Sequence, residues 1–409
     1  MSPGSNVRLL YVSQSFPPAK RPLANVGGMQ RVAVELYQAL TQQPDIDLDA
    51  IILRSSWRWH HLVGLGWLFT TYRQIRRKAK RGEIDAVLFS SMVPAALATV
   101  LRRTLEPRGI PMAAIAHGRD VTQPGPYQLL LVRRILAALD AVLPVSRATG
   151  AECVKRGFPE DHLRVIPNGV DTDRFALRTN RGTRRRALAD ALGDPRHPVP
   201  DEALLLCSVG RQVPRKGFAW FVEEVMPLLP DDVHYWLAGD GPEADAIADT
   251  ARRHGLTHRV RLLGRISDKA LTTLYRGADL FVMPNVPIPG DIEGFGIVIL
   301  EAGLSGMPAI AARLEGIRDV ITEGENGLLL ESGNAWAFSE AIMAYYHDRP
   351  ALEAASQRAA RHTAETFSWA AVADRYVKTM QALRSTAPTE APPVDEHLAP
   401  AARPARGTL

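Results

Sequence analysis

The chain has 409 residues, of which 46% are hydrophobic and 23% are charged, and its formal net charge is +5. This composition is typical of a folded globular protein and excludes a disordered, collagen-like or disulfide-rich chain. The length is too great for one ordinary hydrophobic core, so two domains are expected.

Cysteine spacing and apolar runs indicate the compartment. Cys153 and Cys207 have neither metal-site nor disulfide spacing, which fits a reducing cytoplasm. Residues 1–18 lack a basic segment followed by an apolar one, so no secretory signal is expected. No stretch reaches the ~18 continuous apolar residues of a membrane-spanning helix. We therefore expect a cytoplasmic protein, with any membrane contact peripheral and on the inner face of the cell membrane.

Short apolar strands alternate with helical patterns over the first half of the chain. Predicted strands cover residues 7–16, 48–53, 85–90, 112–116, 141–146 and 164–167. Predicted helices cover residues 29–40, 68–80, 95–105, 128–139 and 148–156. This alternation predicts a parallel sheet with helices on both faces. Residues 1–177 are therefore expected to form a doubly wound, Rossmann-like domain.

The pattern is interrupted and then restarts. An Arg-rich, Pro-bounded stretch, residues 178–200, is interpreted as a linker, and residues 201–366 as a second Rossmann-like domain. Its predicted strands cover residues 204–209, 233–238, 260–263, 280–283 and 309–311. A final helix within residues 367–385 is expected to cross back to the first domain, and the proline-bearing tail 386–409 to be disordered. The two domains are expected to face a central cleft at the carboxyl ends of their strands.

Two glutamates, Glu293 and Glu301, are separated by seven residues, and a Gly-Phe-Gly run follows the first. Because glycine disfavours helix, the helix is predicted to start near Ile297, with Glu301 about one turn inside it. The glycines allow backbone to approach a ligand, and the free amides of the helix start favour an anion. On spacing alone, a pair of surface glutamates is the alternative.

Other loops that follow strands carry glycines and bases. Residues 210–217 place Arg211 and Lys216 where they could neutralise a diphosphate, with a turn of solvated charges as the alternative. Gly28 opens the first helix and fits either a phosphate or a plain turn. Gly239 begins a weak match to a dinucleotide-binding loop, because the acidic residue expected about 20 positions later is missing.

No His or carboxylate cluster has metal-site spacing. The Asp-Thr-Asp run at residues 171–173 follows a strong turn sequence and is interpreted as structural. A metal-independent mechanism without a cofactor is therefore expected.

Together these motifs resemble one family. They are Glu-x7-Glu at 293–301, Gly-Arg-x4-Lys-Gly at 210–217, Gly-Asp-Gly-Pro-Glu at 239–243, His-Gly-Arg-Asp at 117–120, Pro-Asn-Gly-Val-Asp at 167–171 and Asn-Gly-Leu-Leu at 326–329. Over residues 7–383 the chain is similar to the family 4 (GT4) retaining glycosyltransferases, also called glycosyl transferases group 1. The resemblance implies the GT-B fold, in which two Rossmann-like domains face a central cleft.

The resemblance also implies roles for matching residues. The catalytic set is Glu293, His117, Arg211 and Lys216. The donor-binding set is Gly28, Gly239, Arg265, Gly294, Phe295, Gly296, Ile297 and Glu301. Arg211 and Lys216 are expected to neutralise the diphosphate leaving group, Glu301 to bind the ribose, and Glu293 and His117 to lie at the sugar. For His117, a histidine capping a strand end is the alternative. The departing phosphate oxygen is expected to take the acceptor's proton, so Glu293 is not assigned as a nucleophile.

A basic aromatic segment runs from Trp57 to Gly82. It holds three of the seven tryptophans, seven Lys or Arg residues and no acid, so its charge of +7 exceeds the net charge of the chain. A basic amphipathic helix beside aromatic residues is typical of a protein that binds an anionic membrane surface. The alternative is a surface helix that packs its apolar side inward. Nothing else in the sequence supports binding to nucleic acid.

The sequence thus predicts a hexosyltransferase that moves a hexose from a UDP- or GDP-sugar to a lipid-linked or saccharide acceptor. Cell-envelope, exopolysaccharide or glycolipid synthesis is the expected setting. Two alternatives stay open: a nucleotide-sugar epimerase of the same fold, and a non-catalytic basic protein that binds a membrane or a partner.

Overall fold

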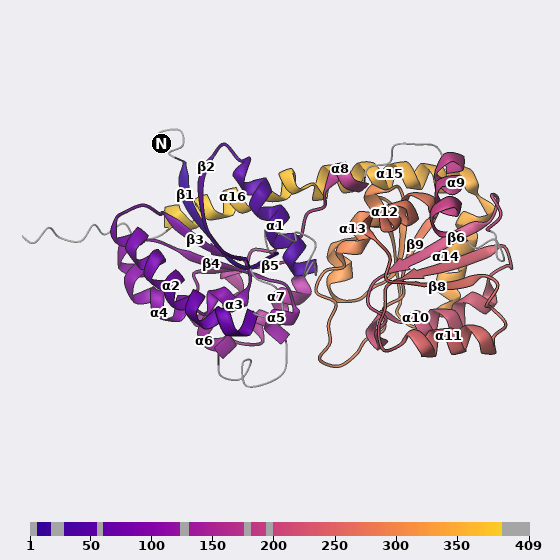
Figure 1. The fold of residues 1–409 in the computed structure, drawn as a ribbon, viewed down its shortest axis with the longest axis horizontal. Helices are drawn as coiled ribbons and strands as arrows, with labels where there is room; N and C mark the ends of the chain where they lie inside the picture. Colours follow the sequence, from indigo (N-terminus) through magenta and orange to yellow (C-terminus); the bar gives the residue numbers. More distant parts are fainter. Residues whose placement is uncertain are drawn as a thin grey trace, which may run out of the picture.

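The computed structural model describes residues 6–17, 28–54, 60–122, 131–175, 181–193 and 199–386. Two α/β domains lie side by side, one early and one late in the sequence, and the last helix passes from the second to the first (Figure 1). Each domain contains one fully parallel sheet among its described residues. The predicted pair of doubly wound domains is therefore confirmed.

The first sheet has the order β2-β1-β3-β4-β5. Its strands are β1 (Val7–Phe16), β2 (Ile46–Arg54), β3 (Ala86–Phe89), β4 (Met112–Ala116) and β5 (Ala141–Pro144). The helices are α1 (Gly28–Thr41), α2 (His60–Lys80), α3 (Met92–Ala95), α4 (Ala98–Leu105), α5 (Arg119–Thr122), α6 (Arg133–Ala138), α7 (Arg147–Val154) and α8 (Thr172–Phe175). Because side chains alternate along a strand, Leu9 and Tyr11 of β1 share a core with α1, while Leu10 and Val12 share one with α2, α4 and α6.

The second sheet has the order β11-β10-β9-β6-β7-β8. Its strands are β6 (Leu204–Val209), β7 (Val233–Ala238), β8 (Val260–Gly264), β9 (Leu280–Met283), β10 (Ala309–Ala312) and β11 (Gly327–Leu330). The helices of the remaining chain are α9 (Arg181–Leu192), α10 (Phe218–Trp220), α11 (Ala244–Arg253), α12 (Asp268–Gly277), α13 (Ile297–Leu304), α14 (Ala335–His347), α15 (Arg349–Phe367) and α16 (Trp369–Thr386). Cys207 and Phe281 pack on the α12 and α13 side, and Leu206 and Val282 on the α11 and α14 side.

One hydrophobic core continues from the first domain into the second. It joins the α1 and α16 side of the first sheet to the α12 and α13 side of the second. Phe175 and Trp369 belong to this core at the two places where the chain passes between the domains. The domains are therefore packed against each other as well as connected by the chain.

Helix α16 crosses back onto the first domain, as predicted. It lies along α1 and the first sheet (Figure 1). The indole nitrogen of Trp369 donates to Glu35 Oε2 on α1 over 2.6 Å. Tyr376 is fully buried in the shared core.

Some predictions of local structure were wrong. Residues 164–167, all described, form no strand, because they end in a proline that cannot donate to a ladder and a turn follows at once. Strand β11 was missed because it begins at the glycine of an Asn-Gly turn signal. Residues 181–192, interpreted as linker, form α9 instead, and its buried Arg185 pairs with Asp279 at 2.6 Å.

Some predictions lie outside the described residues. These are the start of the helix predicted at residues 128–139, and the tail beyond Thr386 that was expected to be disordered.

Candidate active site

The start of α13 has the predicted geometry. The helix begins at Ile297, and Gly296 before it has φ +90°, a left-handed conformation that favours glycine. Phe295 is buried, and Glu301 lies one turn inside the helix with only 3% exposure. Glu293, ahead of the glycines, is also buried. The pair of surface glutamates is therefore ruled out.

Glu293 is the centre of a compact ionic cluster. Lys216 Nζ lies 2.6 Å from Glu293 Oε2, and Asn285 Nδ2 donates to the same oxygen over 3.2 Å. Arg215 also donates to that oxygen. Burial opposes the ionisation of Glu293, but Lys216 and Arg215 outweigh it and lower its pKa to about 2. The carboxylate thus neutralises two neighbouring cations, Lys216 and Arg215.

The sequence predicted Lys216 but missed Arg215 and Asn285. Arg215 lies beside Lys216 in a 3-10 turn, Pro214–Lys216, that follows β6. Asn285 lies two residues after the end of β9. Both positions are at carboxyl ends of neighbouring strands, which is where a parallel sheet places its ligand-binding loops. That rule was the signal that could have found them.

Two glycine loops of the second domain hold each other. A Cβ atom on Gly239 would lie 1.9 Å from the carbonyl oxygen of Gly210, so only glycine fits there. Gln212 N donates to Asp240 O over 2.8 Å, which ties the loops after β6 and β7 together. Arg211 on the first of these loops is exposed. Arg265 is 83% exposed and lies 3.4 Å from Asp240.

A loop of the first domain touches the Gly-Phe-Gly run. A Cβ atom on Gly294 would lie 2.3 Å from the carbonyl oxygen of His117. Gly118, with φ +99°, also lies against the Gly294 backbone. The ring of His117 bonds through Nε2 to Ser90 O over 2.9 Å, the strand-end arrangement named as its alternative. Contact of His117 with a sugar stays a prediction.

Glu301 is bound from both domains. Its Oε1 accepts from Arg31 on α1 over 2.9 Å, and its Oε2 accepts from Tyr275 on α12 over 2.9 Å. Burial raises the pKa of Glu301 although both partners favour its ionised form. Arg31 was missed by the sequence. It lies three residues after Gly28, and no described atom is within 4 Å of a Cβ atom built on Gly28.

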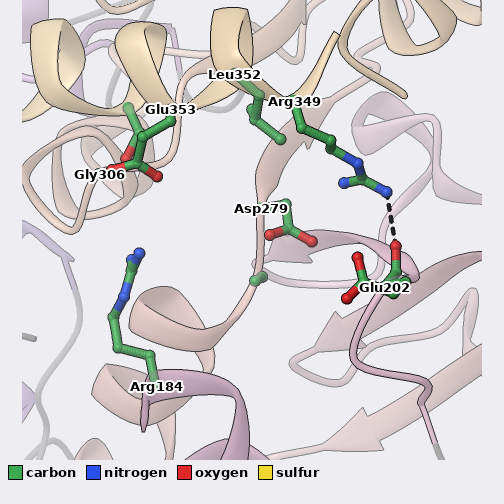
Figure 2. A pocket seen from close by; sticks show the side chains of 9 residues that line it. Arg184, Glu202, Asp279, Gly306, Arg349, Leu352 and Glu353 are labelled. Carbon is green, nitrogen blue, oxygen red and sulfur yellow. Dashed lines mark hydrogen bonds between the residues drawn. The ribbon is translucent and has the colours of Figure 1, made fainter. Parts of the chain in front are cut away.

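A partly open cavity of about 140 Å³ lies elsewhere in the second domain (Figure 2). Asp279 before β9, Gly306 after α13 and Arg349 at the start of α15 line it, and Arg349 Nη2 donates to Glu202 O over 2.8 Å. These residues stand at the amino ends of β6 and β9. None of the predicted site residues is among the described ones that line it. The cavity is therefore separate from the donor site.

Among the residues that the structure describes, no three His, Cys, Asp or Glu side chains gather as a metal site would require. The metal-independent mechanism stays a prediction.

Family profiles match both domains. The profile of Glycosyltransferase Family 4 matches residues 26–174, and that of Glycosyl transferases group 1 matches residues 194–362. The chain belongs to the GT4-type glycosyltransferases. These two matches cover the loops of both domains that meet at Gly294.

Individual relatives of this glycosyltransferase agree with the family. It is 29% identical, over 88% of its length and 95% of the relative, to a GDP-mannose-dependent alpha-(1-6)-phosphatidylinositol monomannoside mannosyltransferase of Mycolicibacterium smegmatis. It is 33% identical to the lipopolysaccharide core biosynthesis glycosyltransferase LpsE of Rhizobium meliloti, over 56% of its own length and 64% of that protein.

Solved structures show the same GT-B fold. Sucrose-phosphate synthase from Thermosynechococcus elongatus superposes with a TM-score of 0.69 at 19% identity, covering 93% of this chain and 100% of that one. Anabaena HepE in complex with UDP and glucose gives a TM-score of 0.66 at 19% identity, covering 92% and 100%. At these identities the likeness confirms the predicted fold class alone.

Proposed function

We propose that this glycosyltransferase moves a hexose, with retention at the anomeric carbon, from a nucleotide diphosphate sugar to a lipid-linked or saccharide acceptor in glycolipid or envelope polysaccharide synthesis. One observation carries the proposal: Glu293, Lys216 and Arg215 are clustered at the start of α13, where the first domain meets the second. Cations and amides fixed before the reaction stabilise a leaving diphosphate without reorganising.

In this proposal the diphosphate competes with Glu293 for Lys216 and Arg215. The acceptor oxygen bonds to the anomeric carbon while the bond from that carbon to the phosphate oxygen breaks. The acceptor's proton passes to the departing phosphate oxygen, so the products are the glycoside and the nucleoside diphosphate. Glu293 then lies at the sugar, and Glu301 accepts the ribose hydroxyls.

GDP-mannose is the preferred donor in this proposal. The relative of which 95% is covered by the match is GDP-mannose-dependent and acts on a phosphatidylinositol monomannoside. The same printed name supports a lipid-linked acceptor. UDP-sugars remain the second group to test.

The outer side of α2 supports an acceptor at an anionic membrane surface. Trp57 and Trp59 lie outside the described residues, but Ile75 and Ala79 of the helix are buried, so its apolar side packs inward. Its other side is basic, and a surface groove of about 530 Å³ is lined by Tyr72, Arg73, Gln74, Arg76, Arg77, Lys80 and Arg81. None of the helices in the described part of the chain is long and apolar enough to cross a bilayer. Basic residues near an anionic surface attract it.

The test is transfer itself. The purified chain is incubated with GDP-mannose, GDP-glucose, UDP-glucose or UDP-galactose and with vesicles that carry phosphatidylinositol mannosides. Products are identified by mass spectrometry and their anomeric configuration by NMR. An α-glycoside from an α-configured donor is expected. Conversion of the free donor sugar without acceptor would mean an epimerase, and lipid binding without any turnover would mean a non-catalytic protein.

A further inference from the structure

A guanidinium from the first domain reaches the carboxylate that we assign to the ribose. Arg31 lies one turn into α1, and its Nη1 donates to Glu301 Oε1 over 2.9 Å. The Arg31 side chain is 19% exposed and that of Glu301 is 5% exposed. This contact is therefore a largely buried bond between domains, and such bonds are costly to leave half-made.

Arg31 is itself held by a second carboxylate. Its Nη2 lies 3.8 Å from Asp268 Oδ1 on α12, and Arg174 on α8 lies 3.2 Å from the same oxygen. Two cations and two carboxylates, counted with Glu301, thus alternate across four helices. A planar guanidinium fork held at both ends has a defined orientation.

The Glu301 carboxylate retains lone-pair positions for further hydrogen bonds. An ionised carboxylate has about four lone-pair positions. Arg31 takes one on Oε1 and Tyr275 one on Oε2, both over 2.9 Å. The positions left over can accept the two hydroxyls of a ribose without displacing Arg31.

We propose that Arg31 is a positioning residue for the nucleotide ribose, which aligns the Glu301 carboxylate from the opposite domain. This inference rests on the proposed function and on the ribose role of Glu301. The ribose-binding carboxylate is then complete only while α1 of the first domain lies against α13 of the second. Recognition of the ribose therefore depends on the docking of the two domains.

The decisive experiment compares GDP with 2′-deoxy-GDP by calorimetric titration of the full chain. The wild type is expected to bind GDP at least about tenfold more tightly, the effect of one hydrogen bond to a charged group. In R31M, GDP binding weakens by about 10- to 100-fold and 2′-deoxy-GDP binding much less. The ratio of the affinity for GDP to the affinity for 2′-deoxy-GDP therefore approaches one. R31K retains the charge but loses the fork, so an intermediate ratio is expected.

R147M is the matched control. Arg147 pairs across the domains with Asp319 over 2.5 Å, away from Glu301, and its side chain is 71% exposed. This variant loses a bond between domains but no contact of the ribose carboxylate. Its ratio is expected to equal that of the wild type, and its thermal unfolding provides the reference for R31M.

The pH dependence separates positioning from packing. Burial raises the pKa of Glu301. The charge of Arg31, the hydroxyl of Tyr275 and the more distant charge of Arg174 oppose that rise. The carboxyl of Glu35 also interacts with that of Glu301. Without Arg31 the Glu301 carboxyl takes up its proton at higher pH. The ratio in R31M should therefore be lower at about pH 6 than at about pH 8.5, while R31K should vary less. Ionisation of the phosphates is common to both ligands and cancels in the ratio.

The following outcomes would overturn the positioning role of Arg31. A wild-type ratio in a folded R31M, or an equal loss for both nucleotides, overturns the positioning role. If R31M does not fold, an unchanged ratio in R31K overturns it. If the wild type binds none of GDP, UDP and ADP, the proposed function fails and this inference with it.

Discussion

The two domains contribute to the site in different ways. In the second domain the charged groups bind one another, since Glu293 accepts hydrogen bonds from Lys216 and Asn285 of the same domain. The first domain contributes through contacts with the second domain: the His117 carbonyl lies against Gly294, and Arg31 donates to Glu301.

The difference shows that the two domains have different roles in the site. In the proposed function, the second domain supplies the cations for an anionic leaving group, which any nucleotide diphosphate sugar requires. The first domain adds contacts to Gly294 and Glu301, and it also carries the basic side of α2. Variants on either side of this division should fail in different ways.

The largest effect is expected inside the second domain. Lys216→Ala should lower transfer about 1000-fold, about 4 kcal/mol in the barrier, because a charge at the leaving diphosphate is lost. Glu293→Ala should also abolish transfer, but donor affinity should fall much more in Lys216→Ala, since Lys216 and Arg215 both remain when Glu293 is removed. Steady-state turnover and calorimetric donor binding measure the two effects.

Lys269→Ala, an exposed lysine of the same domain, is the control and should behave as the wild type. Near-normal turnover of Lys216→Ala would refute the assignment of Lys216 to the diphosphate. It would also refute the claim that the second domain supplies the cations for the leaving group.

The next effect concerns α1 and its contact with α16. Burial raises the pKa of Glu35 from 4.5 to about 7, against the hydrogen bond from Trp369. The folded state thus holds the proton more tightly than the unfolded state. Stability is therefore lost as the pH rises from the unfolded value through about 7, by up to about 3 kcal/mol.

Glu35→Gln has no proton to lose at that position. It should unfold at higher urea concentration than the wild type at pH 8, and the difference should shrink or reverse at pH 5. A difference that is the same at both pH values would show that Glu35 does not titrate in this interval.

A smaller effect is expected at the boundary itself. In Gly294→Ala the new methyl group meets the His117 carbonyl oxygen, so the two loops must separate at a cost of about 2 kcal/mol. Turnover should fall about 30-fold if the loops dock during the reaction. Gly66→Ala on α2 is the control, because no described atom lies within 4 Å of the added methyl. Equal turnover of the two variants would show that turnover does not depend on the contact between the Gly294 and His117 loops.

The smallest effect belongs to the outer face of the first domain. Arg77→Gln should weaken binding to vesicles that contain an anionic lipid by about fivefold, or about 1 kcal/mol, and leave turnover with a water-soluble acceptor unchanged. Arg253→Gln on α11 is the matched exposed control. Vesicle sedimentation measures both, and an equal response would remove the membrane surface from the proposal.

The sequence predicted what depends on nearby residues. The start of α13 at Ile297 follows from the glycines before it and the apolar residues after it, and the strand at residues 112–116 follows from its own apolar run. Arg31 could not be found this way, since its partner Glu301 lies 270 residues away. Arg215 falls in a loop that follows a predicted strand, but its bond to Glu293, 78 residues away, depends on how β6 and β9 pair. Pairing of distant segments is what local patterns leave out.

The two chain passages between the domains lie side by side, and this has a mechanical consequence. Val170 forms a parallel bridge with Ser368, and Val170 N donates to Phe367 O over 2.8 Å. The bridge and the hydrogen bond hold these two segments together, so a rotation of one domain against the other would turn about them. Val170 and Ser368 would then stay nearly fixed, while Gly294 and Gly118, at the contact between the loops, would move apart. Such an opening would give a product a way out at the loops.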